Sequence, residues 1–325
     1  MTNKNVAERI RRIAIRILFP VSPRLSKNFI RIDKAGLRSI ENSINEHYHT
    51  GWRSESNYSK EEYEADVKVH LYERLESDRR MIVPWLDNAA TLQNKRILEI
   101  GCGTGSSTIA LAEQGSKITG IDIDEGALLV AEERSRIYGV DAEFRVLNAQ
   151  EISKAFQAVR FDFIIFFASL EHMTIEERLT SLAQAWEMLP IDGLLVVVET
   201  PNRLWYFDRH TSGLPCFLWL PDELAFAYSR FSSREQFGEL YREYNATSRE
   251  HFLRRGMGVS FHEFDIAIGP AKNLNVISSL STFLGVRDKL RKSRLDRRYK
   301  SIMMSIYPDI HEGFLDEMLF LIIKK

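Results

Sequence analysis

The segment Ile97-Leu98-Glu99-Ile100-Gly101-Cys102-Gly103-Thr104-Gly105 determines the expected fold. Its first four residues are typical of a buried strand. The three glycines that follow at alternate positions predict a turn whose backbone another group can approach closely. Ser106 to Gln114 then predicts a helix, and Gly115 stands where helices commonly end. The segment is therefore interpreted as a strand, a glycine turn and a helix.

A second strand, Lys117 to Ile121, is followed by Asp122, which comes about twenty residues after Gly101. In doubly wound sheets, a carboxylate at about this interval binds the ribose of a nucleotide. The glycine turn and Asp122 together predict a ligand that contains a nucleoside. Glycine turns also serve close packing, so that alternative stays open for the turn alone. A dinucleotide fingerprint needs its third glycine where this chain has Ser106, which counts against a dinucleotide.

An acidic residue two positions before GxGxG resembles the class I S-adenosylmethionine-dependent methyltransferases. The resemblance covers about residues 96 to 202 and, more loosely, the last third of the chain. Its motifs come in the family's order: Gly120-Ile121-Asp122, Phe144 to Ala149, Phe161 to Ile165, Leu170-Glu171-His172 and Leu189 to Val197. The chain departs from the family pattern at Leu194, where a second glycine is usual, and at Asn148, where an aspartate is usual. Asparagine can still accept a hydrogen bond from an adenine amino group.

The resemblance implies an α/β, Rossmann-like methyltransferase fold with a seven-stranded sheet whose last strand is antiparallel. A helical N-terminal cap and insertions after strands 5 and 6 complete it. The implied cofactor is S-adenosyl-L-methionine, with S-adenosyl-L-homocysteine as its product. Cofactor-binding residues are expected at the carboxyl ends of the strands, namely Glu99, Gly101, Cys102, Gly103, Gly105, Asp122, Ile123, Asn148, Ala149, Ser169 and Leu170.

Four regions are expected along the chain. Residues 1–90 form a basic amphipathic helix and a helical cap, and residues 91–200 form the cofactor-binding core. Residues 201–256, rich in aromatic side chains, form an insertion on the acceptor side. Residues 257–325 supply strand 6 (Gly258 to Ile268), a basic helical insertion and strand 7 (Met318 to Ile323). Within the cap, a break is expected at Pro84, and His47, His49 and Trp52 are expected to reach the substrate.

Composition limits the class of protein. The chain has 325 residues, 44% of them hydrophobic, which suffices for a sizeable core. A net charge of −1 argues against a general nucleic-acid binder. With only Cys102 and Cys216, neither a disulfide framework nor a cysteine metal site is expected. The absence of a long apolar run and of a signal peptide predicts a cytoplasmic protein.

Two basic segments have alternative interpretations. Near the N-terminus, Val6, Ile10, Ile13 and Ile17 share one helical face beside several arginines. Residues 1–30 therefore either contact the anionic inner face of a membrane or pack on the domain. Between Val286 and Lys300, eight basic residues stand against two aspartates. This run is either a solvated helix face or an electropositive rim for an anionic acceptor.

Histidines in loops that face the expected cleft are candidates for a general base, since a hydroxyl acceptor must lose its proton. His210 is the first choice, followed by His172 and His262, with Asp208 or Glu263 orienting an imidazole. Each of these histidines also has an ordinary structural interpretation. A metal pair at His47 and His49 is not expected, because no further ligand follows at suitable spacing.

The expected activity is O-methylation of a sugar, a surface glycan such as lipopolysaccharide, or a glycan-linked metabolite. Two features support it. The aromatic insertion suits stacking on sugar rings. The segments Thr200-Pro201-Asn202-Arg203 and Ser260-Phe261-His262-Glu263 resemble bacterial methyltransferases of surface-polysaccharide and secondary-metabolite pathways. A lipid, quinone or other small-molecule acceptor is the alternative. A catalytically silent scaffold that only binds the cofactor is a third hypothesis. Nucleic acid is not an expected acceptor, since no Asn/Asp-Pro-Pro-aromatic motif follows strand 4.

Overall fold

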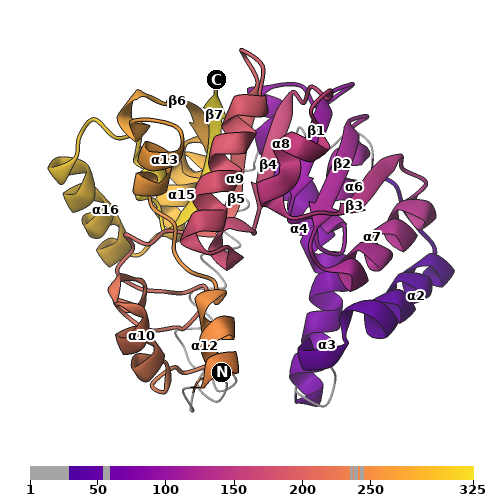
Figure 1. Cartoon of the computed structure of the whole chain (residues 1–325), viewed down its shortest axis with the longest axis horizontal. Helices are drawn as coiled ribbons and strands as arrows, with labels where there is room; N and C mark the ends of the chain where they lie inside the picture. Colours follow the sequence, from indigo (N-terminus) through magenta and orange to yellow (C-terminus); the bar gives the residue numbers. More distant parts are fainter. Residues whose placement is uncertain (1–28, 54–58, 235–236, 238–240, 242–244) are drawn as a thin grey trace.

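A central sheet organises the computed structural model, which describes residues 29–53, 59–234, 237, 241 and 245–325. The sheet has seven strands in the order β3-β2-β1-β4-β5-β7-β6 (Figure 1). The strands are β1 (Arg96–Ile100), β2 (Lys117–Asp122), β3 (Ala142–Val146), β4 (Phe163–Phe167), β5 (Leu194–Pro201), β6 (Asn275–Ser279) and β7 (Met318–Lys324).

The first five strands pair in parallel, and β7 lies antiparallel between β5 and β6. Strand β4, Phe-Ile-Ile-Phe-Phe, is buried along its whole length, as a central parallel strand covered on both faces must be. The strand order reverses between β1 and β4, so the carboxyl ends of these two strands form the expected ligand edge. The predicted fold, including the antiparallel last strand, is confirmed.

Helices cover both faces of the sheet and build two apolar cores (Figure 1). One core includes side chains from α5, α6 and α14, and the other includes side chains from α8, α9 and α13. The α-helices are α2 (Lys34–Ser43), α3 (Lys60–Lys68), α4 (Arg74–Ser77), α5 (Val83–Ala89), α6 (Ser106–Ala112), α7 (Glu125–Tyr138), α8 (Ile152–Ala155), α9 (Ile175–Met188), α10 (Asp222–Ser229), α12 (Ala246–Leu253), α13 (Phe261–Ala267), α14 (Leu280–Leu284), α15 (Val286–Arg291) and α16 (Arg294–Ile306). Short 3₁₀ turns are η2 (Gly51–Arg53), η6 (Ala149–Glu151), η7 (Leu170–His172), η8 (Phe217–Trp219), η9 (Ala271–Asn273) and η10 (Glu312–Leu315).

The N-terminal cap contains π-helical turns that the sequence did not predict. Turn η1 (Ile44–Tyr48) follows α2, and turns η4 (Val69–Glu73) and η5 (Asp78–Ile82) stand on either side of α4. The break expected at Pro84 is wrong, because Pro84 lies in the first turn of α5 and the helix continues through it. A proline lacks the N–H for an ordinary helical bond, and the wide turn η5 directly before α5 accommodates it.

The insertion after β5 has its own small apolar cluster, made by Leu214, Phe217, Leu218, Ala225, Phe226, Tyr241 and Phe252. Most of its aromatic rings are therefore core side chains. Strand 6 was misplaced by the sequence analysis, because residues 261–267 form helix α13 and the strand comes later, at β6. Ser260 and Glu263 form a capping box that starts α13, and this pattern was the signal for a helix.

Several sequence predictions remain predictions. The basic helix expected before residue 29 lies outside the described residues. The domain limits at residues 90, 200 and 256 are not tested by the fold. Within the described part of the chain, no helix has both the length and the apolar character needed to cross a bilayer.

Candidate active site

The glycine turn is fixed to β2 by its own backbone. Gly101 and Cys102 donate N–H groups to the carbonyl oxygen of Ile121 at 2.9 and 3.2 Å. All three glycines have positive φ, with values of +81° for Gly101, +49° for Gly103 and +79° for Gly105. This left-handed region strains any residue that has a side chain.

The three glycines have different surroundings. A Cβ on Gly101 would lie 2.5 Å from Cβ of Ser169, and a Cβ on Gly105 would lie 2.8 Å from Cβ of Ala131. At these two positions glycine permits close packing. A Cβ on Gly103 would meet no atom within 4 Å. Close packing therefore does not explain the glycine at position 103, and the interpretation of this glycine as ligand space stays a prediction.

Two acidic residues hold the turn in shape. Asp122 accepts hydrogen bonds from the N–H of Gly103 at 2.8 Å and from the N–H of Asp124 at 3.0 Å. Glu99 is fully buried and accepts hydrogen bonds from the hydroxyls of Ser107 and Thr108 at the start of α6. Burial raises the pKa of Asp122, and it raises the pKa of Glu99 to about 7. Glu99 thus supports the turn from behind.

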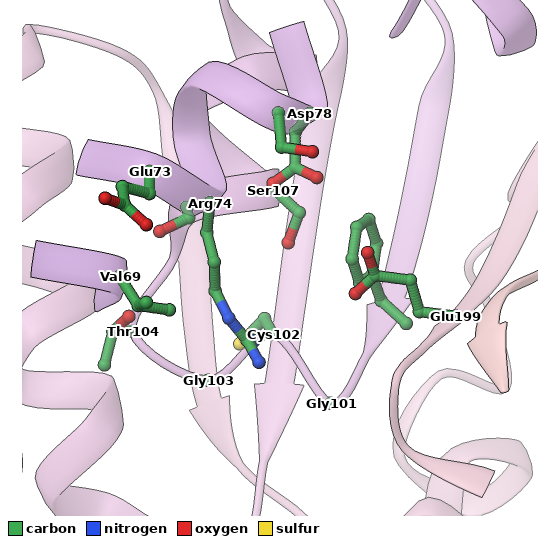
Figure 2. Close-up of a pocket in the computed structure, with 13 residues that line it drawn as sticks. Val69, Glu73, Arg74, Asp78, Gly101, Cys102, Gly103, Thr104, Ser107 and Glu199 are labelled. Atoms are coloured by element: carbon green, nitrogen blue, oxygen red, sulfur yellow. The ribbon is translucent and has the colours of Figure 1, made fainter. Parts of the chain in front are cut away.

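A pocket of about 330 Å³ lies between the glycine turn and the cap (Figure 2). Gly101, Cys102 and Gly103 are the predicted cofactor residues that line it. The rest of the lining comes from the cap, the start of α6, β4 and β5, and was not predicted: Val69, Glu73, Arg74, Ser77, Asp78, Thr104, Ser106, Ser107, Phe167 and Glu199. Glu73 to Asp78 lie at and between the two π-helical turns, whose geometry sequence periodicity does not reveal.

Four ionisable side chains line the pocket, those of Glu73, Arg74, Asp78 and Glu199. Figure 2 shows Arg74 extending from the cap toward Cys102, with Asp78 and Glu199 also in view around the pocket. Burial raises the pKa of Asp78 well above its usual range, and the nearby charge of Glu199 adds to the shift. Burial also raises the pKa of Glu199, opposed by Arg74. The side chain of Arg74 makes no hydrogen bond or ion pair with a described residue, so its guanidinium is available to a ligand.

Backbone strain also marks the pocket. Glu199 has φ +56°, in the left-handed region, and lies where the register of β5 against β7 shifts between Val197 and Thr200. Such strained residues and β-bulges are concentrated at functional sites. Two buried hydroxyls also indicate a functional site, because the Oγ atoms of Ser106 and Ser169 have no hydrogen-bond partner among the described residues. A polar ligand can satisfy such atoms.

Four more predicted cofactor residues are not among those that line this pocket. Ile123 follows Asp122 and is 66% exposed, so it offers an apolar surface at the end of β2. Asn148 caps η6 by accepting a hydrogen bond from the N–H of Gln150 at 2.9 Å. Ala149 and Leu170 are buried, and their side chains serve packing. The roles of these residues toward a ligand stay predictions.

The cap is tied to the glycine turn by Arg134, a fully buried residue of α7. Its guanidinium donates hydrogen bonds to the carbonyl oxygens of Thr104, Leu71 and His70 at 2.9, 3.0 and 2.6 Å. Burial lowers the pKa of Arg134 to about 10. Because it bonds carbonyls on both sides, Arg134 fixes the distance between the two walls of the pocket.

His172 and His210 lie near one another, and each uses Nδ1 in a hydrogen bond. Nδ1 of His172 lies 3.0 Å from the carbonyl oxygen of Arg254, which only accepts, so Nδ1 carries the proton. Nδ1 of His210 lies 3.1 Å from Oγ1 of Thr211, which itself donates to the carbonyl oxygen of Gly256. Both rings therefore leave Nε2 free to accept a proton.

The electrostatics of the two histidines favour neutral rings. The pKa of each is lowered mainly because surrounding protein desolvates the imidazolium, although His172 is an exposed residue. Positive charge on His172 further lowers the pKa of His210, which places the two rings within electrostatic range. Neutral imidazoles with a free Nε2 have the form that a general base requires.

The other predicted acid–base residues do not have the expected geometry. Asp208 accepts hydrogen bonds from the backbone N–H groups of His210, Thr211 and Ser212, so it shapes the loop and does not bond an imidazole. Glu263 caps α13 through Ser260 and pairs with the buried Arg178 at 3.1 Å. Its carboxylate is committed to these partners.

Three cap or helix histidines also differ from expectation. The ring of His262 is exposed and stacks on Phe261 with centroids 4.4 Å apart. The buried His49 bonds Asp66 at 2.8 Å, and His47 lies in a separate surface groove, so neither lines the pocket. The side chain of Trp52 lies outside the described residues. In the described part of the chain, no cluster of three or more metal-ligating side chains occurs.

Comparison with known proteins identifies relatives of the central region. Residues 97–193 match the family described as "Methyltransferase domain". A ubiquinone biosynthesis O-methyltransferase from Pseudomonas putida (strain GB-1) is 35% identical over 193 residues, covering 55% of this chain and 81% of the relative. One from Pseudomonas aeruginosa (strain LESB58) is 33% identical over 121 residues, covering 37% of this chain. That match spans 50% of the relative, so the chain covers only half the length of this protein.

Solved methyltransferase structures are also similar to parts of this chain. A methyltransferase from Methanosarcina mazei is 32% identical with a TM-score of 0.35, covering 38% of this chain and 60% of that chain. A magnesium protoporphyrin IX methyltransferase from Synechocystis PCC 6803 with bound cofactor is 20% identical with a TM-score of 0.37, covering 55% and 81% of the respective chains.

Proposed function

Because this chain belongs to the class I S-adenosylmethionine-dependent methyltransferases, we propose that it methylates a hydroxyl of a lipid-soluble, quinone-type small molecule. The observation that carries the cofactor part of the proposal is the open space at Gly103: an added Cβ would meet no atom within 4 Å, and Gly103 lines a pocket of about 330 Å³. The acceptor part is supported by the relatives, which are named as ubiquinone biosynthesis O-methyltransferases.

The charged groups of the pocket fit the methionine end of the cofactor, which is a zwitterion. Arg74 is suited to its carboxylate, and Asp78 with Glu199 is suited to its ammonium group. Binding of that ammonium favours ionisation of carboxyl groups whose pKa burial has raised. In this proposal Asp122, at the end of β2, accepts hydrogen bonds from the ribose hydroxyls, and Ile123 beside it offers a flat base an apolar contact.

The cofactor supplies an activated sulfonium methyl group, so the protein must position the acceptor oxygen and exclude water. An acceptor hydroxyl becomes a good nucleophile as its proton is removed. His210, with His172 beside it, accepts that proton at Nε2, because Nδ1 of each ring is already used as a donor. Fixed Nδ1 contacts also hold the rings in one orientation, which favours catalysis over a freely rotating imidazole.

A glycan acceptor, the first hypothesis from the sequence, has less support. It relied on aromatic rings of residues 201–256 being available to stack on sugars. Phe217, Phe226 and Phe252 instead fill the core of the insertion, while Trp219 and Phe231 remain substantially exposed. Apolar acceptors agree better with the relatives' names.

The test is methyl transfer from labelled S-adenosylmethionine to two fractions of bacterial extract, a lipid extract and a delipidated glycan extract. The proposal predicts label in a lipid-extractable product that alkaline cleavage of esters does not release, as expected for a methyl ether. Label confined to the glycan extract would restore the first hypothesis. Cofactor binding without transfer to either fraction would favour the silent scaffold.

A further inference from the structure

Helices α15 and α16 come between β6 and β7 in the sequence. Their surface combines unpaired basic side chains with exposed aliphatic side chains. Figure 1 shows α16 at the outer edge of the molecule, at the opposite end from α2 and α7. On this helix, Leu295 is 59% exposed, Ile302 is 48% exposed and Ile306 is 70% exposed. With 3.6 residues per turn, these three positions fall within about 40° of one another. They form a single stripe, which we call the α16 stripe.

The helix that carries the stripe is fixed to the body of the protein. Asp296 accepts a hydrogen bond from the hydroxyl of Tyr206 at 2.6 Å and pairs with Arg209. Lys300 pairs with Asp316 at 2.8 Å, and Tyr299 donates to the carbonyl oxygen of Leu204. These contacts lie on the inner side of α16. The outward orientation of the stripe therefore follows from the fold and is not the result of a loosely attached helix.

Positive charge borders the α16 stripe. Five basic residues of α15 and α16 are exposed, and their side chains form no hydrogen bond or ion pair with a described residue: Lys289, Arg291, Arg294, Arg297 and Arg298. At 3.6 residues per turn, Arg298 lies about 40–80° from the three residues of the stripe and Arg294 about 80–120°, both on the same flank of the helix. The carboxylates of this segment, Asp288 and Asp296, are already paired, so they do not neutralise these five.

We propose that α15 and α16 form a docking surface for an anionic lipid bilayer, with Leu295, Ile302 and Ile306 entering the headgroup region and the arginines contacting lipid phosphates. Helices that lie in a membrane interface have this combination of Lys or Arg with Leu or Ile, and a contiguous apolar patch rimmed by polar residues marks a protein or membrane interaction site. A nucleic acid would use the charges but not the aliphatic stripe. Protein interfaces rely mainly on Trp, Tyr and Arg anchors, and the stripe has no aromatic residue.

This inference does not depend on the proposed function. Bilayer docking can be measured without an acceptor, and loss of docking leaves the cofactor pocket intact. If both proposals hold, docking brings the protein to the surface from which a lipid-soluble acceptor is extracted.

The experiment is co-sedimentation of the full-length protein with phosphatidylcholine vesicles that contain or lack phosphatidylglycerol. Two double variants test the surface: Ile302→Ser with Ile306→Ser, and Arg294→Gln with Arg298→Gln. The matched controls are Ile191→Ser, an apolar residue 86% exposed in the loop before β5, and Lys154→Gln, an exposed residue of α8. All variants keep residues 1–28, so any contribution of that segment is common to them.

Wild-type protein should prefer the anionic vesicles. Because each basic residue near an anionic surface contributes about 1 kcal/mol, the arginine variant should bind about 30-fold more weakly. The isoleucine variant should lose roughly tenfold or more, and both controls should bind as wild type. Unchanged thermal unfolding and S-adenosylhomocysteine affinity would show that the variants are folded.

Two outcomes would overturn the inference. One is anionic-vesicle binding by both double variants within twofold of their controls. The other is a wild-type protein that does not distinguish the two vesicle types. If analytical ultracentrifugation showed that the isoleucine variant dissociates a dimer while vesicle binding is unchanged, the surface would be a contact between two copies of the chain.

Discussion

Replacing Gly103 with alanine should weaken cofactor binding while leaving the fold nearly intact. Gly103 has φ +49°, and an added Cβ would meet no protein atom within 4 Å, so the folded protein pays only the backbone strain of about 1–2 kcal/mol. The same methyl group would occupy the pocket that Gly103 lines. Overpacking by one methyl group costs about 1–3 kcal/mol, which corresponds to roughly 5- to 150-fold in affinity.

Gly139→Ala is the matched control for this prediction. Gly139 ends α7 with φ +63°, and it too would place a Cβ in open space, but it does not line the pocket. Thermal unfolding should show similar losses of stability for the two variants. Calorimetric titration with S-adenosylhomocysteine should show weakened binding for Gly103→Ala only. Equal affinities for both variants would refute the assignment of Gly103 to ligand space.

Four further predictions concern the walls of the pocket and the acid–base groups. Asp122→Ala should weaken S-adenosylhomocysteine binding in calorimetry by about 1.5–3 kcal/mol, since it removes a charged acceptor; an unchanged affinity would exclude Asp122 from the site. His210→Ala should lower turnover about 10²–10⁴-fold at nearly constant cofactor affinity. Because burial lowers the pKa of His210, wild-type turnover should fall only when the pH drops below that lowered pKa. A variant whose turnover stays within a few-fold of wild type would transfer the role to His172. Burial raises the pKa of Glu171 to about 8, so the native state keeps a proton that the unfolded state loses above the ordinary glutamate pKa. The free energy of unfolding should therefore decrease from about pH 4.5 to pH 8. Denaturant titrations should show a flatter pH dependence for Glu171→Gln, and an unaltered slope would contradict this. Arg134→Met should lower the free energy of unfolding by about 3 kcal/mol because three buried carbonyl groups lose their donor, with Arg136→Met, on the exposed face of α7, as the unaffected control.

The sequence predicts the sheet and the glycine turn well because both depend on local patterns. Alternate glycines after an apolar strand, and Asp122 after the next strand, identify the ligand edge without any knowledge of distant contacts. Strand 6 failed for a different reason. Val259, Phe261 and Phe264 are compatible with a strand or a helix, and the capping box at Ser260 and Glu263 was the local signal that would have decided for the helix.

The cap side of the pocket was beyond local prediction. Arg74 and Asp78 reach the pocket because π-helical turns shift the helix register, and no periodicity in the sequence marks such turns. Glu199 depends on a bulge in β5 that arises from its pairing with β7, a strand more than a hundred residues away. Asp208 and Glu263 were assigned from spacing, but Asp208 bonds backbone amides of its own loop, and Glu263 pairs with Arg178 of the distant helix α9.

The central claim is that the pocket between the glycine turn and the cap binds S-adenosylmethionine. Isothermal titration of wild-type protein, stripped of bound ligand, with S-adenosylhomocysteine tests it most directly. The account predicts saturable binding at one site per chain, competitive with S-adenosylmethionine and weakened in Gly103→Ala. Absence of binding at millimolar ligand by folded wild-type protein would contradict the account.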